Sequence, residues 1–431
     1  MFRHRGNSTE VVGIVLMGLA GLAPTGARAQ PAESGDAKVV VTEQRSSDYV
    51  TRDEYERLRS ELNDVKRRVD APRSDTRDAS GSFFGDDRFL VTGYASAGYV
   101  NRRSESTFMA GINPIFVFRI NDRIFVESEV GLELESEDAV GETMVELEYA
   151  NINFIVNDYL TVTAGKFLTP FGQFPERLHP TWINKLPDHP LPYEEEGGLV
   201  PFSSLGVQVR GAVPVARLGM GGDAKVVYAA YVANGSSLVE DDEEEAGNLN
   251  FDNFTDNNDS KAVGGRLGIL PLPELELGAS IQWGRVASGV DALLVGVDAA
   301  YQKEIDSLMG TIDARVEWVW SSVDTVTFDP DGSGGFGPLR YNNDRNGGYA
   351  QLAYRPTRAN DRIVRNIELV GRYDTIHAPA AAPGAATDTR LTLGVDYWVT
   401  PNVVLKAAYQ IDSPERGPHD NGVMLQAAVG F

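Results

Sequence analysis

The chain contains no cysteine among its 431 residues, which excludes disulfides, thiolate metal sites and thiol catalysis. No segment has about 18 consecutive apolar residues, so we expect no membrane-spanning helix. Basic residues are also scarce: 39 Lys and Arg stand against 62 Asp and Glu, for a net charge of −23. A charge of this sign argues against nucleic acid as a partner.

Catalytic and metal-binding motifs are missing as well. No G-x-S-x-G motif is present, and no sequence pattern brings a nucleophile, a base and an orienting group together. The histidines at 179 and 189 lack the spacing of a zinc site. The acidic run at 240–245 lacks EF-hand spacing, so we interpret it as a solvated outer loop, with divalent-cation binding as the alternative. We therefore predict no enzyme, no metal site and no cofactor.

The first 29 residues have the pattern of a secretory signal peptide. A basic head at residues 3–5 precedes an apolar core at 11–23 and an A-x-A site that ends at Ala29. The apolar core is too short to span a bilayer, although an uncleaved anchor is the alternative. We predict cleavage after Ala29 and export of the mature chain.

A short helical segment lies between two predicted linkers. Residues 30–47 are polar and rich in Ala and Ser. Between Thr51 and Val69, apolar residues recur at alternating intervals of four and three, which predicts a coiled-coil helix over 48–71. So short a helix needs a partner; a single amphipathic helix lying on the protein is the alternative. A second linker follows at 72–87.

From Arg88 onward, the sequence predicts strands that alternate apolar and polar residues. Near residue 123, for example, Val126, Val130 and Leu132 fall on one face and glutamates on the other. Most of these segments have about 10–14 residues, enough to cross a bilayer at a tilt. Sixteen strands are predicted, beginning near residues 88, 107, 123, 142, 159, 204, 223, 260, 275, 290, 308, 346, 365, 388, 402 and 421.

The connections favour a membrane barrel over a soluble β-sandwich. Short turns alternate with longer loops, including one at 323–345, as in porins with short periplasmic turns. We therefore predict an all-β, 16-stranded antiparallel transmembrane β-barrel over 88–431. An even strand number places both ends, and the helix at 48–71, on the periplasmic side. In the fourth strand the apolar face switches parity, which a β-bulge near Tyr149 would explain.

The longest ordered connection is predicted at about 169–203. It is rich in Pro, Gly and aromatic residues, and its apolar side chains are numerous enough to pack. We expect it to fold into the bore and to narrow it. Its predicted constriction residues are Phe171, Phe174, Arg177, Trp182, Lys185, Asp188, Glu194, Glu195 and Glu196.

Charged residues of the strands are assigned to the bore. A charge costs a few kcal/mol on the lipid face but little on a hydrated inner face. The predicted pore-lining bases are Lys166, Arg210, Arg266, Arg315, Arg372, Arg390 and Lys406, and the acids are Glu127, Glu129, Glu133, Glu135, Glu146, Glu148, Asp313, Glu317, Glu368 and Asp374.

The loop acids Asp188, Glu194, Glu195 and Glu196 would face part of the basic wall. Opposed charges across a constriction create a transverse field that orients polar solutes. The alternative is that these groups pair locally. In the first interpretation the selectivity element is the loop together with Lys166, Arg210, Arg315 and Arg372.

The segment Gly165-Lys-Phe-Leu-Thr-Pro-Phe-Gly-Gln-Phe174, followed by Pro175-Glu-Arg177, resembles the phosphate-selective porin O/P family of bacterial outer-membrane porins. The resemblance implies a sixteen-stranded barrel, a homotrimer and a constricting third loop. Phosphate-specific members line the pore with arginines and lysines; the loop here carries one lysine, Lys185. The last strand also resembles the C-terminal signature of such barrels, which ends on an aromatic residue, here Phe431, recognised by the barrel assembly machinery.

These patterns predict a passive channel of the bacterial outer membrane for small hydrophilic, charged solutes, with anions such as phosphate implied by the resemblance. The alternative is a non-conducting structural or adhesion barrel that tethers the envelope through its N-terminal helix.

Overall fold

A computed structural model describes residues 88–431 apart from 104–105, 138–139, 195–196, 219–223, 240–245, 252–259, 329–338, 383–386 and 416–417. The chain divides into two compact units, 1–79 and 80–431, and all described residues belong to the second. The predicted signal peptide, both linkers, the coiled-coil helix and the loop residues Glu195 and Glu196 lie outside the described residues.

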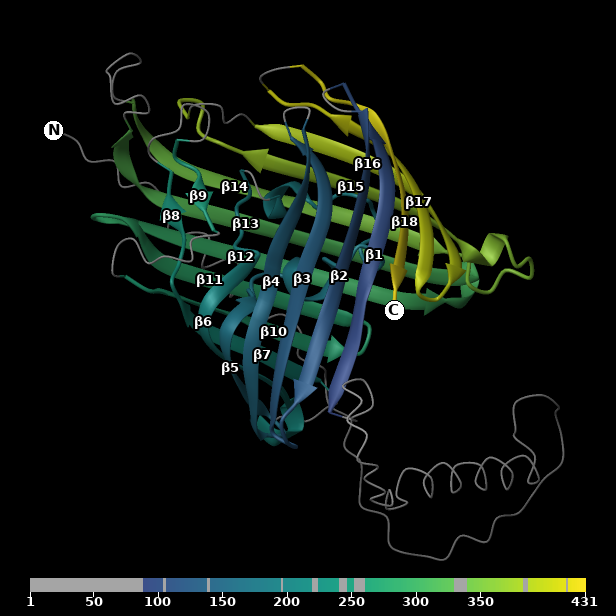
Figure 1. The fold of residues 1–431 in the computed structure, drawn as a ribbon, viewed down its shortest axis with the longest axis horizontal. Coiled ribbons are helices and arrows are strands. Elements are labelled where there is room, and N and C mark those ends of the chain that lie inside the picture. The colour runs from purple at the N-terminus through teal and green to yellow at the C-terminus, as the bar shows by residue number, and fades with distance from the viewer. Residues whose placement is uncertain are drawn as a thin grey trace, which may run out of the picture. The chain divides into compact units, whose positions relative to one another are not determined.

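The described residues form a closed antiparallel β-barrel (Figure 1). Each barrel strand pairs with the barrel strands that precede and follow it in the chain, and β1 closes the barrel against β18. The sixteen strands are β1 Phe89–Asn101, β2 Ser106–Arg119, β3 Ile124–Glu137, β4 Val140–Asn157, β5 Leu160–Leu168, β6 Ser203–Pro214, β7 Lys225–Ala233, β10 Ala262–Leu272, β11 Leu275–Ala287, β12 Val290–Ile305, β13 Gly310–Phe328, β14 Leu339–Arg355, β15 Ile367–His377, β16 Asp388–Thr400, β17 Val403–Asp412 and β18 Gly422–Gly430. The prediction of a 16-stranded antiparallel barrel is confirmed.

The remaining elements are short. Two further strands, β8 Ser237–Leu238 and β9 Leu249–Asn250, form a small hairpin of their own. The helical turns are α3 Phe174–Arg177, η1 Leu191–Tyr193, η2 Val215–Leu218, η3 Asp306–Leu308 and η4 Val364–Asn366. Within the described part of the chain, no helix is long and apolar enough to cross a membrane.

Side chains stabilise the tight turns. At the β2–β3 turn, Asn121 Oδ1 accepts hydrogen bonds from the backbone amides of Arg123 and Ile124, at 2.8 and 3.0 Å. At the β4–β5 turn, Asn157 Oδ1 accepts one from the amide of Tyr159 at 2.9 Å. Asparagine favours such turns because its side chain replaces a backbone acceptor. These local bonds fix the strand register on either side of each turn.

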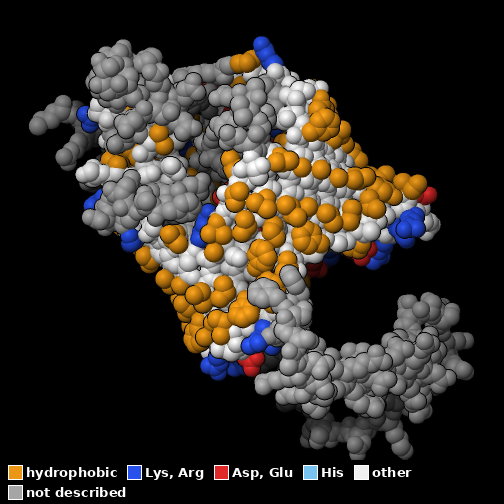
Figure 2. Space-filling view, viewed as in Figure 1, with side chains coloured by type: hydrophobic (Ala, Val, Ile, Leu, Met, Phe, Trp, Pro, Cys, Tyr) orange, Lys and Arg blue, Asp and Glu red, His pale blue; other side chains and the backbone are white. Residues whose placement is uncertain are grey.

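The alternation of the strands separates two faces. Along β16, Leu391, Leu393 and Val395 are exposed on the outside, whereas Thr392, between the first two, and Asp396, after the third, are buried on the inside. Figure 2 shows hydrophobic side chains spread over the visible outer surface of the strands. The outer face is therefore apolar and the inner face polar, as a barrel in lipid requires.

The predicted bulge in the fourth strand is present. Glu129 of β3 pairs with Tyr149 of β4, and the next residue, Val130, pairs with Leu147. Glu148 is therefore the extra residue, and beyond it the inward parity of β4 changes from Glu146 to Asn151. A bulge adds one residue to one strand and so exchanges its two faces.

One predicted boundary is wrong. The sequence analysis placed a loop at 323–345 and a strand start near 346, but β13 extends to Phe328 and β14 begins at Leu339, with these two residues paired. The polar residues Asn342, Asn343 and Asp344 give the segment the composition of a loop. A hairpin that extends beyond the apolar zone can carry such side chains, since backbone pairing continues to stabilise it.

Candidate functional site

The connection between β5 and β6, residues 169–202, lies against the inner wall of the barrel. Six of its apolar side chains are almost fully buried and form one cluster with inward residues of β11 to β14. Burial of side chains this large stabilises the contact by roughly 1.5–3 kcal/mol each. We call this segment the bore loop. The loop members of the cluster are Phe171, Phe174, Leu178, Tyr193, Leu199 and Val200.

Glu317 of β13 anchors the start and the end of the bore loop together. Its Oε2 accepts hydrogen bonds from the amide of Gln173 at 3.0 Å and from the hydroxyl of Tyr193 at 2.5 Å. Its Oε1 accepts one from the hydroxyl of Tyr349 on β14 at 2.5 Å. Gly172 turns the chain with a φ of +66°, and a Cβ there would lie 2.1 Å from Glu317 Oε2. Only glycine fits this approach.

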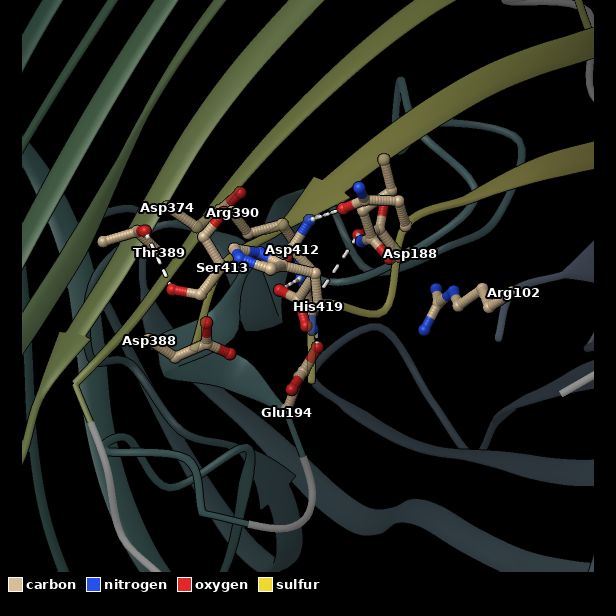
Figure 3. A network of polar contacts seen from close by, with 12 residues as sticks. Arg102, Asp188, Glu194, Asp374, Asp388, Thr389, Arg390, Asp412, Ser413 and His419 are labelled. Carbon is tan, nitrogen blue, oxygen red and sulfur yellow. Dashed lines mark hydrogen bonds and ion pairs between the residues drawn. The ribbon is translucent and has the colours of Figure 1, made fainter. Parts of the chain in front are cut away.

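Two arginines of the wall bind the middle of the loop. Arg372 of β15 forms ion pairs with Asp188 at 2.7 Å and with Asp374 at 2.9 Å. Arg390 of β16 contacts Glu194 and, at 3.2 Å, Asp412 (Figure 3). Asp188 and Glu194 thus neutralise the arginines by direct contact. Of the two interpretations in the sequence analysis, local pairing describes these four groups.

Two lysines complete the attachment. Lys406 of β17 donates hydrogen bonds to the carbonyl of Thr181 at 2.5 Å and to Gln426 Oε1 at 2.9 Å. Lys185 of the loop pairs with Glu368 of β15 at 2.5 Å. Between these lysines, Leu186 packs into a second apolar cluster with Val100, Ala353, Val370, Ala408 and Met424. The polar contacts of Lys185 and Lys406 therefore lie on either side of the apolar contact made by Leu186.

The helical turn α3 contacts β6 and β11 through ion pairs. Arg177 forms a two-bonded ion pair with Glu276 of β11, at 2.5 and 3.1 Å. Glu176 pairs with Arg210 of β6 at 2.6 Å. Arg266 of β10 joins this group, since it contacts Glu276 at 2.9 Å and Asp298 of β12 at 2.5 Å.

A cavity of about 430 Å³ lies beside α3. The side chains of Arg210 and Arg177 keep 46% and 41% of their surface exposed there, more than the other predicted bases of the bore. Its wall is formed by β3 to β7 and β10, through residues that include Phe125, Glu127, Thr161, Ala212 and Tyr228.

The predicted acids of β3 and β4 whose side chains the structure describes lie on the inner face. Glu129 is fully buried and accepts a hydrogen bond from the hydroxyl of Tyr94 at 2.7 Å. Glu127 accepts one from Asn153 at 3.1 Å. Glu146 lies 3.7 Å from Lys166. The side chain of Glu135 lies outside the described residues.

That the predicted residues line the pore stays a prediction. The structure places these residues in different surroundings. Lys166, Arg266, Arg372, Arg390 and Lys406 are buried beneath the loop or beside acidic partners. Arg315 pairs with Asp313 on its own strand at 2.8 Å. Trp182 lies over Gly430, where a Cβ would be 2.6 Å from its ring.

Sequence reasoning missed a second inward-folding segment. Part of the connection between β7 and β10 reaches the wall, since Leu238 and Ala246 join the cluster of the bore loop. Tyr341 and Asn343 of β14 donate hydrogen bonds to the carbonyls of Ala246 and Gly247, both at 2.7 Å. The inward-facing positions of β14 continue through Tyr341 and Asn343. This alternation could have revealed the contact, but the sequence analysis assigned 323–345 to a loop.

Histidines of the bore loop serve packing. The ring of His189 lies 5.1 Å from that of Phe174 and 6.0 Å from that of Phe202. Burial lowers the pKa of His189 to about 4, helped by the neighbouring His179 and Arg372 and opposed by Asp188. Within the described ranges, no group of three or more His, Asp or Glu side chains is arranged to hold a metal ion.

No protein-family model matches the chain, and no curated protein matches it in sequence. Among solved structures, it is similar to OmpF of Salmonella typhi in complex with daunomycin, at 12% identity and a TM-score of 0.50, over 80% of this chain and 97% of that one. It is also similar to the anion-selective porin from Comamonas acidovorans (9%, TM-score 0.49, 80% and 99% covered) and to the outer membrane channel DcaP of Acinetobacter baumannii (12%, 0.47, 80% and 97%). At 12% identity the similarity to OmpF establishes the fold alone, which is that of outer-membrane porins.

Proposed function

We propose that the protein is an outer-membrane porin, a passive diffusion channel for small hydrophilic, charged solutes. The observation that carries this proposal is the polar inner face of a closed sixteen-stranded barrel, narrowed by a loop that is bonded to the wall from within. A barrel of sixteen strands is wide enough to enclose water. Charged side chains inside it remain hydrated wherever the loop does not cover them.

The cavity beside α3 supports passage of charged solutes. It combines about 430 Å³ of space with the exposed guanidinium groups of Arg177 and Arg210. Such groups orient a solute by its charge before it meets the constriction. Phosphate and other small anions belong to this proposal through the family resemblance, as does assembly into a homotrimer.

The cellular context follows from the same proposal. After cleavage behind Ala29, the mature chain inserts into the outer membrane with its apolar strand face toward lipid, guided by the barrel assembly machinery through Phe431. The helix at 48–71 then lies in the periplasm.

One observation favours a second function, a barrel that does not conduct and serves as a structural tether. The bore loop meets nearly the whole circumference: His179 lies 3.6 Å from Glu129 of β3, Glu176 binds β6, Asp188 binds β15, and Lys406 of β17 holds Thr181. A loop attached on so many sides could close the bore.

Planar bilayers separate the two functions. Purified, refolded protein should insert as discrete current steps in 1 M KCl, and protein denatured by boiling should give none. If heat-modifiable, correctly folded protein inserts into liposomes but produces neither current steps nor swelling in isotonic sugars, the channel proposal is wrong and the tether is favoured.

A further inference from the structure

The connections β12–β13 and β14–β15 are hydrogen-bonded to each other. The amide of Arg358 donates to the carbonyl of Met309 at 3.0 Å, and the hydroxyl of Tyr354 donates to the carbonyl of Leu308 at 2.6 Å. Both connections lie at the end of the barrel that holds the C-terminus, and Figure 1 shows the β14–β15 connection at the right of the view. We call this unit the turn pair; it comprises residues 306–309 and 356–366.

The turn pair exposes apolar side chains. Ile363 and Met309 expose 62% and 58% of their surface, and Leu308 and Val364 are exposed as well. Apolar side chains at a membrane surface gain free energy when they enter the boundary between headgroups and acyl chains. The patch continues the apolar outer face of the barrel, which includes the exposed Leu369 of β15.

Two arginines flank the apolar side chains of the β14–β15 connection. Arg362 precedes Ile363, and Arg365 follows Val364; both arginines are exposed. Within the part of the chain that the structure describes, neither guanidinium group forms an ion pair or a hydrogen bond. The backbone beneath them is fixed, since Arg355 Nε donates to the carbonyl of Arg365 at 3.0 Å.

Other charged groups of the turn pair are engaged within the protein. Arg358 forms ion pairs with Glu304 at 2.7 Å and with Asp306 at 2.5 Å. Asp361 Oδ1 accepts hydrogen bonds from the backbone amides two and three positions further along the chain, at 2.8 and 3.0 Å. The two flanking arginines are therefore the groups that can bind an anion from outside.

A groove of about 490 Å³ lies on the outer face of the neighbouring strands. It forms where short residues, among them Ala314 and Gly371, lie between long ones such as Leu352 and Tyr373. Four residues of β14, about 13 Å, separate Leu352 from the start of the turn pair, less than the roughly 15 Å of hydrocarbon in one leaflet. An acyl chain whose headgroup lies at the turn pair can therefore reach the groove.

We propose that the turn pair and the groove bind one phospholipid of the periplasmic leaflet, with the headgroup phosphate at Arg362 and Arg365 and an acyl chain in the groove. The inference rests on the proposed outer-membrane location but not on conduction. Arginine suits this role because its planar guanidinium group bonds two phosphate oxygens at once. Basic side chains near a membrane surface favour anionic lipids, so phosphatidylglycerol should bind more tightly than phosphatidylethanolamine.

The groove favours a lipid over a soluble protein partner. A periplasmic protein could cover the exposed apolar side chains of the turn pair. It could not reach a groove on the wall that faces the hydrocarbon of the bilayer. One phospholipid satisfies the arginines and the groove together.

Native mass spectrometry of the refolded protein, released from detergent that contains phosphatidylglycerol, tests the proposal. The wild type should retain one lipid molecule. Arg362→Gln/Arg365→Gln should weaken retention by about tenfold or more, because each arginine near a membrane surface contributes about fivefold to the attraction of an anionic lipid. The matched control, Arg103→Gln/Arg340→Gln, removes two exposed arginines at the opposite end of the barrel and should retain the lipid as the wild type does.

Gly371→Leu tests the groove separately. A Cβ at Gly371 would lie 3.5 Å from the side chain of Leu393, an ordinary contact, so the barrel can accommodate the substitution. The leucine side chain would fill the groove and leave both arginines in place. Retention of phosphatidylglycerol should weaken by about fivefold or more, since the acyl chain loses apolar contact area.

The outcomes are distinguishable. Equal retention by the wild type and Arg362→Gln/Arg365→Gln, or unchanged retention by Gly371→Leu, overturns the inference. A changed oligomeric state of Gly371→Leu without loss of lipid would identify the groove as a contact between copies of the chain and also overturns it. Protein that inserts into liposomes but retains no lipid overturns the inference alone. Folded protein that does not insert overturns the outer-membrane location and the inference together.

Discussion

Asp188 of the bore loop and Arg372 of β15 form an ion pair at 2.7 Å, in which the side chain of Arg372 has no exposed surface. Arg372 also donates hydrogen bonds to the backbone carbonyls of Asp188 and His189, at 3.0 and 2.9 Å. The loop cannot leave the wall without uncovering a buried charge. The bore loop is therefore attached as firmly as a core element.

Asp188→Asn should loosen the bore loop. The substitution leaves the buried Arg372 with Asp374 as its remaining carboxylate partner, and the loss of one charge-assisted contact costs about 1.5–3 kcal/mol. We expect a lower temperature for the heat-induced mobility shift on gels, and larger, noisier current steps in planar bilayers. Glu304→Gln, which removes an exposed partner of Arg358, should change neither. Equal effects of the two substitutions would show that burial does not determine the strength of the attachment.

Gly172→Ala should disrupt the start of the loop, and Gly197→Ala provides a control. Both glycines have positive φ, +66° and +73°, so both substitutions carry a similar backbone cost of about 1 kcal/mol. At Gly172 the new Cβ would also lie 2.1 Å from Glu317 Oε2, whereas nothing lies within 4 Å at Gly197. The steric clash adds about 1–3 kcal/mol. Thermal unfolding of the refolded barrels in detergent should give a lower midpoint temperature for Gly172→Ala than for Gly197→Ala. Similar midpoints would argue that Glu317 does not fix the start of the loop.

Arginine substitutions test which face meets lipid. Leu267 lies at the centre of β10 and is exposed on the outer face, whereas Ala212 of β6 lines the cavity beside α3. Leu267→Arg should reduce the free energy of folding into bilayers by about 2–4 kcal/mol, because a charge at the bilayer midplane is poorly solvated. Ala212→Arg should have little effect. Folding into vesicles over a urea series measures both, and the reverse ranking would invert the assignment of the faces.

Acidic pH should weaken the packing of the loop through His189. Its pKa of about 4 in the packed loop lies below the ordinary value, so a released loop binds a proton below about pH 6.5 while the packed loop does not. The packing is therefore fully present above pH 6.5 and weakens as the pH falls toward 4. Because His189 as a whole residue is only partly buried, the loss is on the order of 2 kcal/mol.

The charges around His189 make the substitution informative. His179, Arg372 and Lys406 disfavour its protonation and Asp188 favours it. His189→Gln removes the titrating group, so the mobility-shift temperature of the variant should change less between pH 7 and pH 5 than that of the wild type. If the two proteins respond alike, another group controls the acid sensitivity of the loop.

Periodic features of the sequence predicted the barrel well. The alternation in β3 and the parity switch in β4 gave the strands and the bulge, because lipid and water impose a strict period of two. The pairing partners of the loop could not be derived in this way. The loop has no repeating pattern, and it folds over a curved wall. Its path alone determines that Asp188 pairs with Arg372 and that Tyr193 donates a hydrogen bond to Glu317.

Charge alone was a poor guide to exposure inside the bore. The sequence marks Arg266 and Arg210 equally as inward bases, yet the first is buried between two acids and the second borders the cavity. Only the path of the loop distinguishes them. The prediction of a loop at 323–345 was wrong for a related reason, because the polar composition of this segment was interpreted as irregular backbone.

The seam between β1 and β18 joins the two ends of the barrel. Thr92 and Phe431, 339 positions apart in the sequence, share a hydrogen bond, and the backbones of Gly93 and Phe431 pair at 3.1 and 2.9 Å. During biosynthesis, the free edge of β1 can complete its backbone hydrogen bonds only after β18 has been made. A chain stalled before β18 would expose two unpaired edges, a state prone to aggregation.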